Sequence, residues 1–283
     1  RDMVDLEPAS AAQQERYGAL WEGYCADNEL DYAAVSGAIR SRCAAVQVAR
    51  LESRLPELPD RAASLSYLGD VYALQGRFAK AVSAFQEALR QNPLSVTGHM
   101  QLGLALMRQG RPVEAVEALQ AARRLDPTDP LAAYHCGTVL AWAERPVEAA
   151  AALEDALRLD PNLTDARHQL GRVRAGQGSV EEAARHFAEA VRLAPGFVEA
   201  RNDLGVAYAR LGRFEEAARQ FREALRLRPR DAEIHTNLGM ALAELGRVGE
   251  AIDQFLEALA ADPGHAAARE NLRETEARQR AAP

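Results

Sequence analysis

Small and apolar residues follow a helical spacing through most of the chain, and they occur in pairs of short runs. One such pair consists of Leu238, Ala241, Leu242 and Leu245, followed by Ala251, Phe255, Ala258 and Leu259. Residues three and four apart lie on one face of a helix. Gly246 and Arg247 separate the two runs, so this stretch predicts two short helices joined by a tight turn.

The same pattern returns six times between residues 62 and 265, at an interval of 34 residues. Each copy has a glycine in its first run, two alanines in its second run and a closing proline. The glycines are Gly69, Gly103, Gly137, Gly171, Gly205 and Gly239, and the prolines are Pro93, Pro127, Pro161, Pro195, Pro229 and Pro263. The residue before proline avoids helical angles, so each proline ends a second helix. One copy cannot bury its apolar face alone, so stacked copies must share a continuous core.

The period and the small, aromatic and proline positions resemble those of the tetratricopeptide repeat (TPR) family. The resemblance implies an all-α fold, a right-handed α-solenoid of stacked antiparallel helix pairs. It divides the chain into six repeats, 62–95, 96–129, 130–163, 164–197, 198–231 and 232–265. Small residues on both helices let their backbones approach closely. The space beside them is filled by Phe85, Leu119, Leu153, Phe187, Phe221 and Phe255.

The two ends of the chain depart from the repeat. Residues 1–61 predict helices with Tyr17, Trp21 and Tyr24 on one face. This segment is interpreted as an N-terminal helical cap, or as an aromatic face that docks on a partner or folds back into the groove. Residues 266–283 begin a seventh copy and then turn polar, which predicts a C-terminal capping helix and tail.

Composition narrows the class of partner. The formal net charge is −7, which argues against a general nucleic-acid binder and against an anionic membrane surface. No apolar run approaches the ~20 residues that span a bilayer, so we expect no membrane insertion within these residues. Lys80 is the only lysine among 34 basic residues, which suggests a GC-rich, bacterial genome.

The start of the chain leaves the compartment open. It begins at Arg1 and not at methionine, which predicts that a signal peptide, a membrane anchor or another domain precedes it. The bacterial cytoplasm and periplasm both remain candidates. Cys25 and Cys43 would pair only in an extracytoplasmic protein, and helix geometry sets them several turns apart. Cys136 replaces a repeated leucine and is expected to be a buried free thiol.

The family resemblance also implies where a partner would bind. In TPR proteins the first helices line the concave side, and contacts come from the second, fifth, ninth, twelfth and thirteenth positions of each unit. In copies two and three these positions include Met100, Leu104, Met107, Arg108, Leu131, Tyr134 and Trp142. Exposed Met and aromatic residues gathered in one place suit an adaptable protein-binding surface, although single side chains could instead pack between helices.

Copies four and five place polar residues at the same positions. His168, Arg172 and Arg210 could share an anion, and Asn202 lies at an equivalent position. Asp165 and Glu199 lie close enough in sequence register to neutralise these cations. Both a carboxylate-binding site and a self-compensated surface therefore remain open.

A row of polar residues precedes the repeated leucine of each first helix: Gln101, His135, Gln169, Asp203, Asn237 and Asn271. It is similar to the asparagine ladder of the O-linked N-acetylglucosamine transferase superhelix, which grips the backbone of an extended peptide. Side-chain amides donate and accept together, so they can hold any peptide sequence. Only two members match by type, and Tyr67 interrupts the row. The carboxylate clamp of chaperone-binding TPR domains has no matching residues here.

The sequence predicts no catalytic residues, no cofactor and no metal site, because it contains no phosphate loop and no zinc-ligand spacing. In copy four, Arg174 replaces a repeated Tyr or Leu, and Gly176 and Gly178 predict a soft joint. Two functions remain. In the first, the chain is a non-catalytic protein-protein interaction scaffold or adaptor that binds a partner's segment in its groove. Alternatively, it is the regulatory or targeting arm of a larger enzyme or bacterial cell-envelope complex.

Overall fold

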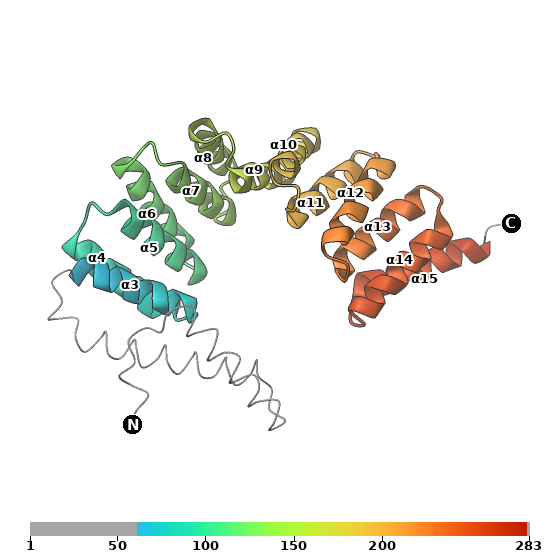
Figure 1. Ribbon diagram of the computed structural model, residues 1–283, viewed down its shortest axis with the longest axis horizontal. Helices are drawn as coiled ribbons and strands as arrows, with labels where there is room; N and C mark the ends of the chain where they lie inside the picture. Colours follow the sequence, from blue (N-terminus) through green and yellow to red (C-terminus); the bar gives the residue numbers. More distant parts are fainter. Residues whose placement is uncertain (1–60, 282–283) are drawn as a thin grey trace, which may run out of the picture. The chain divides into compact units, whose positions relative to one another are not determined.

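The computed structural model describes residues 61–281, and all regular structure in that range is α-helical (Figure 1). The first helices of the copies are α3 (Arg61–Leu74), α5 (Val96–Arg108), α7 (Pro130–Trp142), α9 (Thr164–Gly176), α11 (Val198–Arg210) and α13 (Ala232–Glu244). The second helices are α4 (Phe78–Gln91), α6 (Pro112–Leu125), α8 (Pro146–Leu159), α10 (Val180–Leu193), α12 (Phe214–Leu227) and α14 (Val248–Ala261). The last helix is α15 (Ala266–Ala281). The expected fold class, an all-α solenoid of stacked antiparallel helix pairs, is confirmed. The proposed N-terminal cap, with Cys25 and Cys43, lies outside the described residues.

The chain divides into two compact units, one ending at Pro93 and the other beginning at Leu94. In the first unit α3 packs on α4, and the ring of Phe85 lies against Gly69. Tyr72 is buried there, and the guanidinium carbon of Arg77 lies 4.9 Å from the centroid of its ring. This distance allows a cation–π contact, which holds the turn between the two helices.

Within the second unit, contacts follow a fixed rule from α5 to α15. Each first helix packs on its own second helix, and each second helix packs on the next first helix. First helices also contact the next first helix, as in α5 with α7 and α11 with α13. No such contact joins any two second helices between α6 and α14. The first helices therefore form a common inner wall, as the family resemblance implied.

Close approach within each pair depends on the repeated glycine. A Cβ atom on Gly171 would lie 2.6 Å from Cε1 of Phe187, and one on Gly205 would lie 2.5 Å from Cε1 of Phe221. Both rings are almost fully buried. The glycine thus provides the space into which the aromatic ring of the second helix packs.

Cys136 is buried in the core of copy three and is a free thiol, as expected. Burial raises the pKa of this thiol, so it stays protonated.

The turns inside the pairs need a left-handed residue. Gly178 and Gly212 have φ of 84° and 72° and serve this purpose in copies four and five. In copy three the same place holds Glu144, whose φ is 58°. Glutamate adopts this conformation at a cost of about 1 kcal/mol, which glycine avoids.

The turns that precede α9, α11, α13 and α15 are each closed by a side chain of the helix that follows. The side chain at the fourth position of a first helix donates to the carbonyl oxygen of the preceding closing proline, either from a guanidinium or from an imidazole. These bonds are Arg167 to Pro161, Arg201 to Pro195 (2.9 Å), His235 to Pro229 (3.0 Å) and Arg269 to Pro263 (2.5 Å). They give a hydrogen-bond partner to a carbonyl in the turn, just beyond the end of the second helix.

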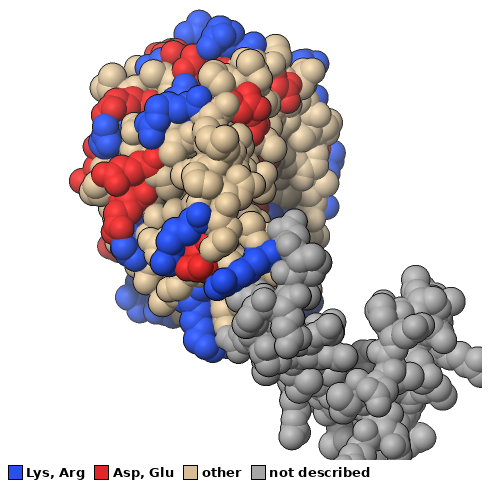
Figure 2. Space-filling view, turned by 90° about the vertical axis from the view of Figure 1, so that its left-hand side faces the viewer, with Lys and Arg blue, Asp and Glu red and all other residues tan. Residues whose placement is uncertain are grey.

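Many second helices also begin with an ion pair between an arginine and the glutamate three residues later. The pairs are Arg111–Glu114 (2.5 Å), Arg145–Glu148 (2.6 Å), Arg247–Glu250 (2.6 Å) and Arg213–Glu216. Each arginine lowers the pKa of its glutamate through the hydrogen bonds that it donates. On the face drawn in Figure 2, basic and acidic side chains lie interspersed, which agrees with such local pairing.

Candidate functional site: a groove along the first helices

Three hollows lie along the inner wall of the second unit. The tryptophan hollow, about 900 Å³, lies on α5, α7 and α9 and contains Trp142. The bridging hollow, about 180 Å³, lies on α9 and α11 and contains Arg172 and Arg210. The methionine hollow, about 510 Å³, lies on α11, α13 and α15 and contains Met240.

The hollows share lining residues and form one groove. Arg172 lines both the tryptophan hollow and the bridging hollow. Val206 and Arg210 line both the bridging hollow and the methionine hollow. The groove therefore continues across the five first helices from α5 to α13 and the last helix, α15, with an apolar side chain near each end.

The tryptophan hollow combines an exposed ring with cations. Trp142 ends α7 with 49% of its surface exposed, beside the half-buried Met107 of α5. Arg108 and Arg172 are exposed and line the same hollow. The strained Glu144 is its one acidic lining residue. A large aromatic face flanked by guanidinium groups can bind an apolar side chain and a carboxylate together.

The methionine hollow has a more apolar floor and balanced charges. Met240 is 49% exposed above the buried rings of Phe221 and Phe255. Its rim carries Glu274 and Arg278, which form an ion pair at 2.7 Å. This end of the groove favours an apolar side chain and offers little net charge.

The structure brings together part of the set of residues expected to bind a partner. Met107, Arg108, Trp142, Arg172 and Arg210 line the groove. The other six lie outside the lining of the hollows, namely Met100, Leu104, Leu131, Tyr134, His168 and Asn202. Leu131 is exposed at the start of α7, whereas Tyr134 is half-buried, and burial raises the pKa of its hydroxyl.

His168 lies beneath the groove and not within it. Only 7% of its surface is exposed, and its ring contacts the rings of Phe187 and Phe197 at centroid distances of 5.6 and 4.8 Å. Its Nε2 atom forms a hydrogen bond with Asp203 at 2.7 Å. The three residues that could have shared an anion are therefore not brought together, since only Arg172 and Arg210 line the groove.

The polar row is partly engaged in bonds between first helices. Asp203 bonds His168 of the preceding copy, and Asn237 donates to the amide oxygen of Asn202 at 3.1 Å. Four members line the groove, Gln169, Asp203, Asn237 and Asn271. Gln101 and His135 are half-buried outside the lining of the hollows. Burial lowers the pKa of His135, so its imidazole is neutral near pH 7.

Sequence reasoning missed most of the methionine hollow. Met240 and Glu244 occupy the ninth and thirteenth positions of copy six, and Glu274 and Arg278 occupy those of the partial seventh copy. The rule applied to copies two to five would have found them. The repeat register therefore also predicts this end of the groove.

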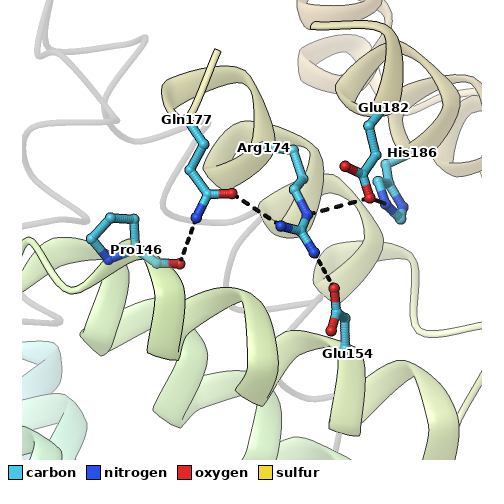
Figure 3. A network of polar contacts seen from close by, with 6 residues as sticks. All are labelled: Pro146, Glu154, Arg174, Gln177, Glu182 and His186. Carbon is cyan, nitrogen blue, oxygen red and sulfur yellow. Dashed lines mark hydrogen bonds and ion pairs between the residues drawn. The ribbon is translucent and has the colours of Figure 1, made fainter. Parts of the chain in front are cut away.

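Copy four contains a polar network that no other described copy shows in the same form (Figure 3). The guanidinium of Arg174 pairs with Glu154 of α8, with Glu182 of α10 at 3.4 Å and with the side-chain oxygen of Gln177 at 3.1 Å. Gln177 in turn donates to the backbone oxygen of Pro146 at 3.2 Å. The end of α9 is thereby connected to α8, across the place where glycines predicted a soft joint.

Other kinds of site are not found in the described part of the chain. Residues 61–281 contain no group of three or more His, Cys, Asp or Glu side chains arranged to hold a metal ion. None of the helices in this range has the length and apolarity to cross a membrane.

These features define a class of protein, a helical-repeat solenoid with a grooved inner wall. The model of the tetratricopeptide repeat matches overlapping windows that run from residue 44 to residue 266: 44–96, 68–130, 100–164, 137–196, 168–220 and 202–266. The chain belongs to the tetratricopeptide repeat family.

Solved structures show the same fold. A chain of the APC/C hetero-tetramer Cut9–Hcn1 aligns with a TM-score of 0.66 and 20% identity, over 80% of this chain and 44% of that one. MamA aligns with a TM-score of 0.53 and 30% identity, over 57% of this chain and 94% of that one. YrrB, described as a TPR protein with an unusual peptide-binding site, aligns with a TM-score of 0.57 and 25% identity, over 67% of this chain and 97% of that one. No curated protein sequence matches the chain significantly.

Proposed function

We propose that this protein is a non-catalytic scaffold that holds a segment of a partner protein in the groove of its second unit. Trp142 and Met107 anchor the segment at one end, and Met240 anchors it at the other. Arg108, Arg172 and Arg210 lie between these anchors or beside them.

The observation that carries the proposal is the continuity of the three hollows. A groove that shares Arg172, Val206 and Arg210 between neighbouring hollows suits an extended chain better than a compact small molecule. Large apolar side chains such as Trp142 and Met240 are expensive to leave half-exposed to water, and such sites commonly mark protein contacts. YrrB, at 25% identity, is also described as binding peptide, which supports the same use of the fold.

The amide row would add contacts that do not depend on the partner's sequence. Gln169 and Asn271 line the groove, and their amides can donate to and accept from a peptide backbone. Asn237 already donates to Asn202, so its own amide oxygen is the group that a ligand N–H would meet.

The test compares two double variants in pull-downs from a lysate of the native source. The groove variant is Met107→Glu with Trp142→Glu. The control variant is Val113→Glu with Leu256→Glu, two side chains that are 68% and 50% exposed and line none of the hollows. Both variants change net charge equally, so they separate the groove from general surface effects.

We expect the groove variant to lose its specific partners by about tenfold or more, because apolar anchors dominate binding energy. The control variant should recover them as the wild type does. Circular dichroism melts should show that both variants stay folded. Equal recovery by the two variants would refute the proposed binding surface.

A further inference from the structure

The arginines of the groove differ from those on the rest of the second unit. Arg111, Arg145 and Arg247 each pair with the glutamate three residues later, at 2.5–2.6 Å. In contrast, the side chains of Arg108 and Arg172 form no ion pair or hydrogen bond within residues 61–281. Arg210 donates only to the backbone oxygen of Ala175, at 3.4 Å. The groove thus presents three guanidinium groups whose charge no carboxylate neutralises by direct contact.

The charge of the tryptophan and bridging hollows has the opposite sign to that of the whole chain. The formal net charge is −7, yet the tryptophan and bridging hollows together carry three arginines and two carboxylates. One of the carboxylates, Asp203, is held at 2.7 Å by His168. The other, Glu144, is exposed in the turn after α7. This section of the groove therefore has a formal charge of +1, three arginines against two carboxylates, on a chain whose net charge is −7.

The cations also have a definite arrangement around the apolar anchor. Arg108 and Arg172 line the same hollow as Trp142 and Met107, and Arg210 lies one hollow further along. Guanidinium groups bind carboxylates through paired N–H donors, and they do so most strongly where water is partly excluded. The indole of Trp142 lines the same hollow and would exclude part of the water around these guanidinium groups.

We propose that the partner segment is an acidic peptide in which an aromatic or large aliphatic residue is flanked by Asp or Glu. The apolar residue packs on Trp142 and Met107. The carboxylates on one side bind Arg108 of α5, and those on the other side bind Arg172 of α9 and Arg210 of α11. This assignment rests on the proposed function of the groove and adds the chemistry of the ligand.

The experiment uses three pools of fluorescein-labelled peptides of about 12 residues, a length that spans several hollows when extended. Each pool has a central Leu, Phe or Trp, flanked by Asp and Glu, by Ser and Gln, or by Lys and Arg. A fourth pool has acidic flanks and a central Ser. Fluorescence anisotropy with the full chain gives Kd for each pool at about 0.05 M and about 0.5 M salt.

We expect the acidic pool with an apolar centre to bind about tenfold tighter than the neutral pool at low salt, and to lose most of this advantage at high salt. The acidic pool with a central Ser should bind at least about fivefold more weakly, because it lacks the anchor. A single-stranded oligonucleotide serves as a polyanion without such an anchor and should bind no better than that pool.

Charge variants assign the effect to the groove. The triple variant Arg108→Gln, Arg172→Gln, Arg210→Gln should weaken binding of the acidic pool by about tenfold. The matched control Arg124→Gln, Arg185→Gln, Arg219→Gln removes three exposed arginines of the second helices, which line none of the hollows. It should change Kd by less than about twofold. Glu144→Gln should tighten the same interaction by about twofold, because it removes a like charge.

Several outcomes would overturn this proposal. They are binding of the neutral or basic pool at least as tightly as the acidic one, equal losses in the two triple variants, binding of the oligonucleotide in preference to peptide, or binding of none of the pools. Preference for the neutral pool, lost in Met107→Glu, Trp142→Glu, would leave the groove function standing and refute only the acidic ligand. Binding that survives that variant would refute the proposed function itself.

Discussion

Copy four (α9 and α10) and copy five (α11 and α12) have similar cores. Each places a guanidinium group beside the first turn of its second helix, but the arginine comes from a different sequence position in each copy. In copy five, Arg213 lies over the ring of Tyr208, 4.4 Å from its centroid, and pairs with Glu216. In copy four, the position of Tyr208 holds Arg174 and that of Arg213 holds Ser179. Arg174 nevertheless pairs with Glu182, the counterpart of Glu216. A guanidinium beside the first turn of the second helix is thus retained although its place in the sequence has moved.

Arg174 also forms contacts with the preceding copy that Arg213 does not form. It reaches Glu154 of α8 and, through Gln177, the backbone of Pro146. Copy four is therefore attached to the copy before it by polar contacts. The soft joint that Gly176 and Gly178 predicted is opposed by this network, whose partners are too far apart in sequence to be recognised there.

The largest expected change in stability comes from a comparison of the two cores. Phe187→Ala in copy four and Phe221→Ala in copy five should each lower the free energy of unfolding by about 3–5 kcal/mol, because both rings fill the space beside a glycine. Urea unfolding followed by circular dichroism measures this loss. A loss in copy four less than half that in copy five would show that the cores differ.

The next effect tests the exchange of Tyr and Arg directly. Arg174→Tyr should destabilise the protein by about 1 kcal/mol, since Glu154 and Glu182 lose their shared partner. Adding Ser179→Arg restores the arrangement of copy five and should recover about half of that loss.

Hydrogen exchange separates this effect from a general loss of stability. Amides at residues 174–178 should exchange no faster than those at 208–212 in the wild type, and about tenfold faster in Arg174→Tyr. Faster exchange already in the wild type would support the soft joint. Additive effects of the two substitutions would argue against a shared role for the guanidinium.

A smaller effect concerns the glycines of copy four. Gly176 has open space around its Cα and no positive φ, and copy five has Arg210 at that place. Gly176→Ala should therefore stabilise the protein by about 0.5–1 kcal/mol. Gly178 has a φ of 84°, so Gly178→Ala should destabilise it by about 1 kcal/mol. Thermal melts of the two variants would contradict this interpretation if both shifts had the same sign.

The smallest effect is electrostatic. The hydrogen bonds from Arg213 lower the pKa of Glu216 below its ordinary value. The pair therefore stabilises the fold above the unfolded-state pKa, and that contribution is lost as the pH falls through the folded-state pKa. NMR titration of the carboxyl carbon should show the lowered pKa, and Arg213→Gln should raise it toward the ordinary value. An unchanged titration would remove the proposed cause.

The sequence alone predicted the helix pairs well because their determinants are local and repeated. Gly205, Phe221 and the closing prolines recur at a fixed spacing, so each copy reinforces the interpretation of the others. The same register places Trp142 at the end of a first helix, and Trp142 lines the tryptophan hollow. Its exposure followed from its place on the helix and not from its chemistry.

What the sequence could not predict depends on residues that depart from the repeat. His168 is covered by Phe197, which occupies a place where other copies have Ser95, Asp129 or Asp231 as a helix cap. Its polar partner Asp203 belongs to the next copy. Register assigns a residue to a face, but its burial depends on particular side chains, such as Phe197, that do not recur from copy to copy.

The bonds from α9, α11, α13 and α15 to the preceding proline carbonyl determine which changes of chain length keep the turns intact. Arg201 serves the turn after copy four, and His235 serves the turn after copy five. Deleting or duplicating a segment equal to one period keeps an arginine or histidine behind each proline between copies four and six. Recombination in multiples of that period would thus give shorter or longer proteins in which these turns keep their hydrogen bonds. An insertion or deletion of another length would leave a proline carbonyl without its side-chain donor.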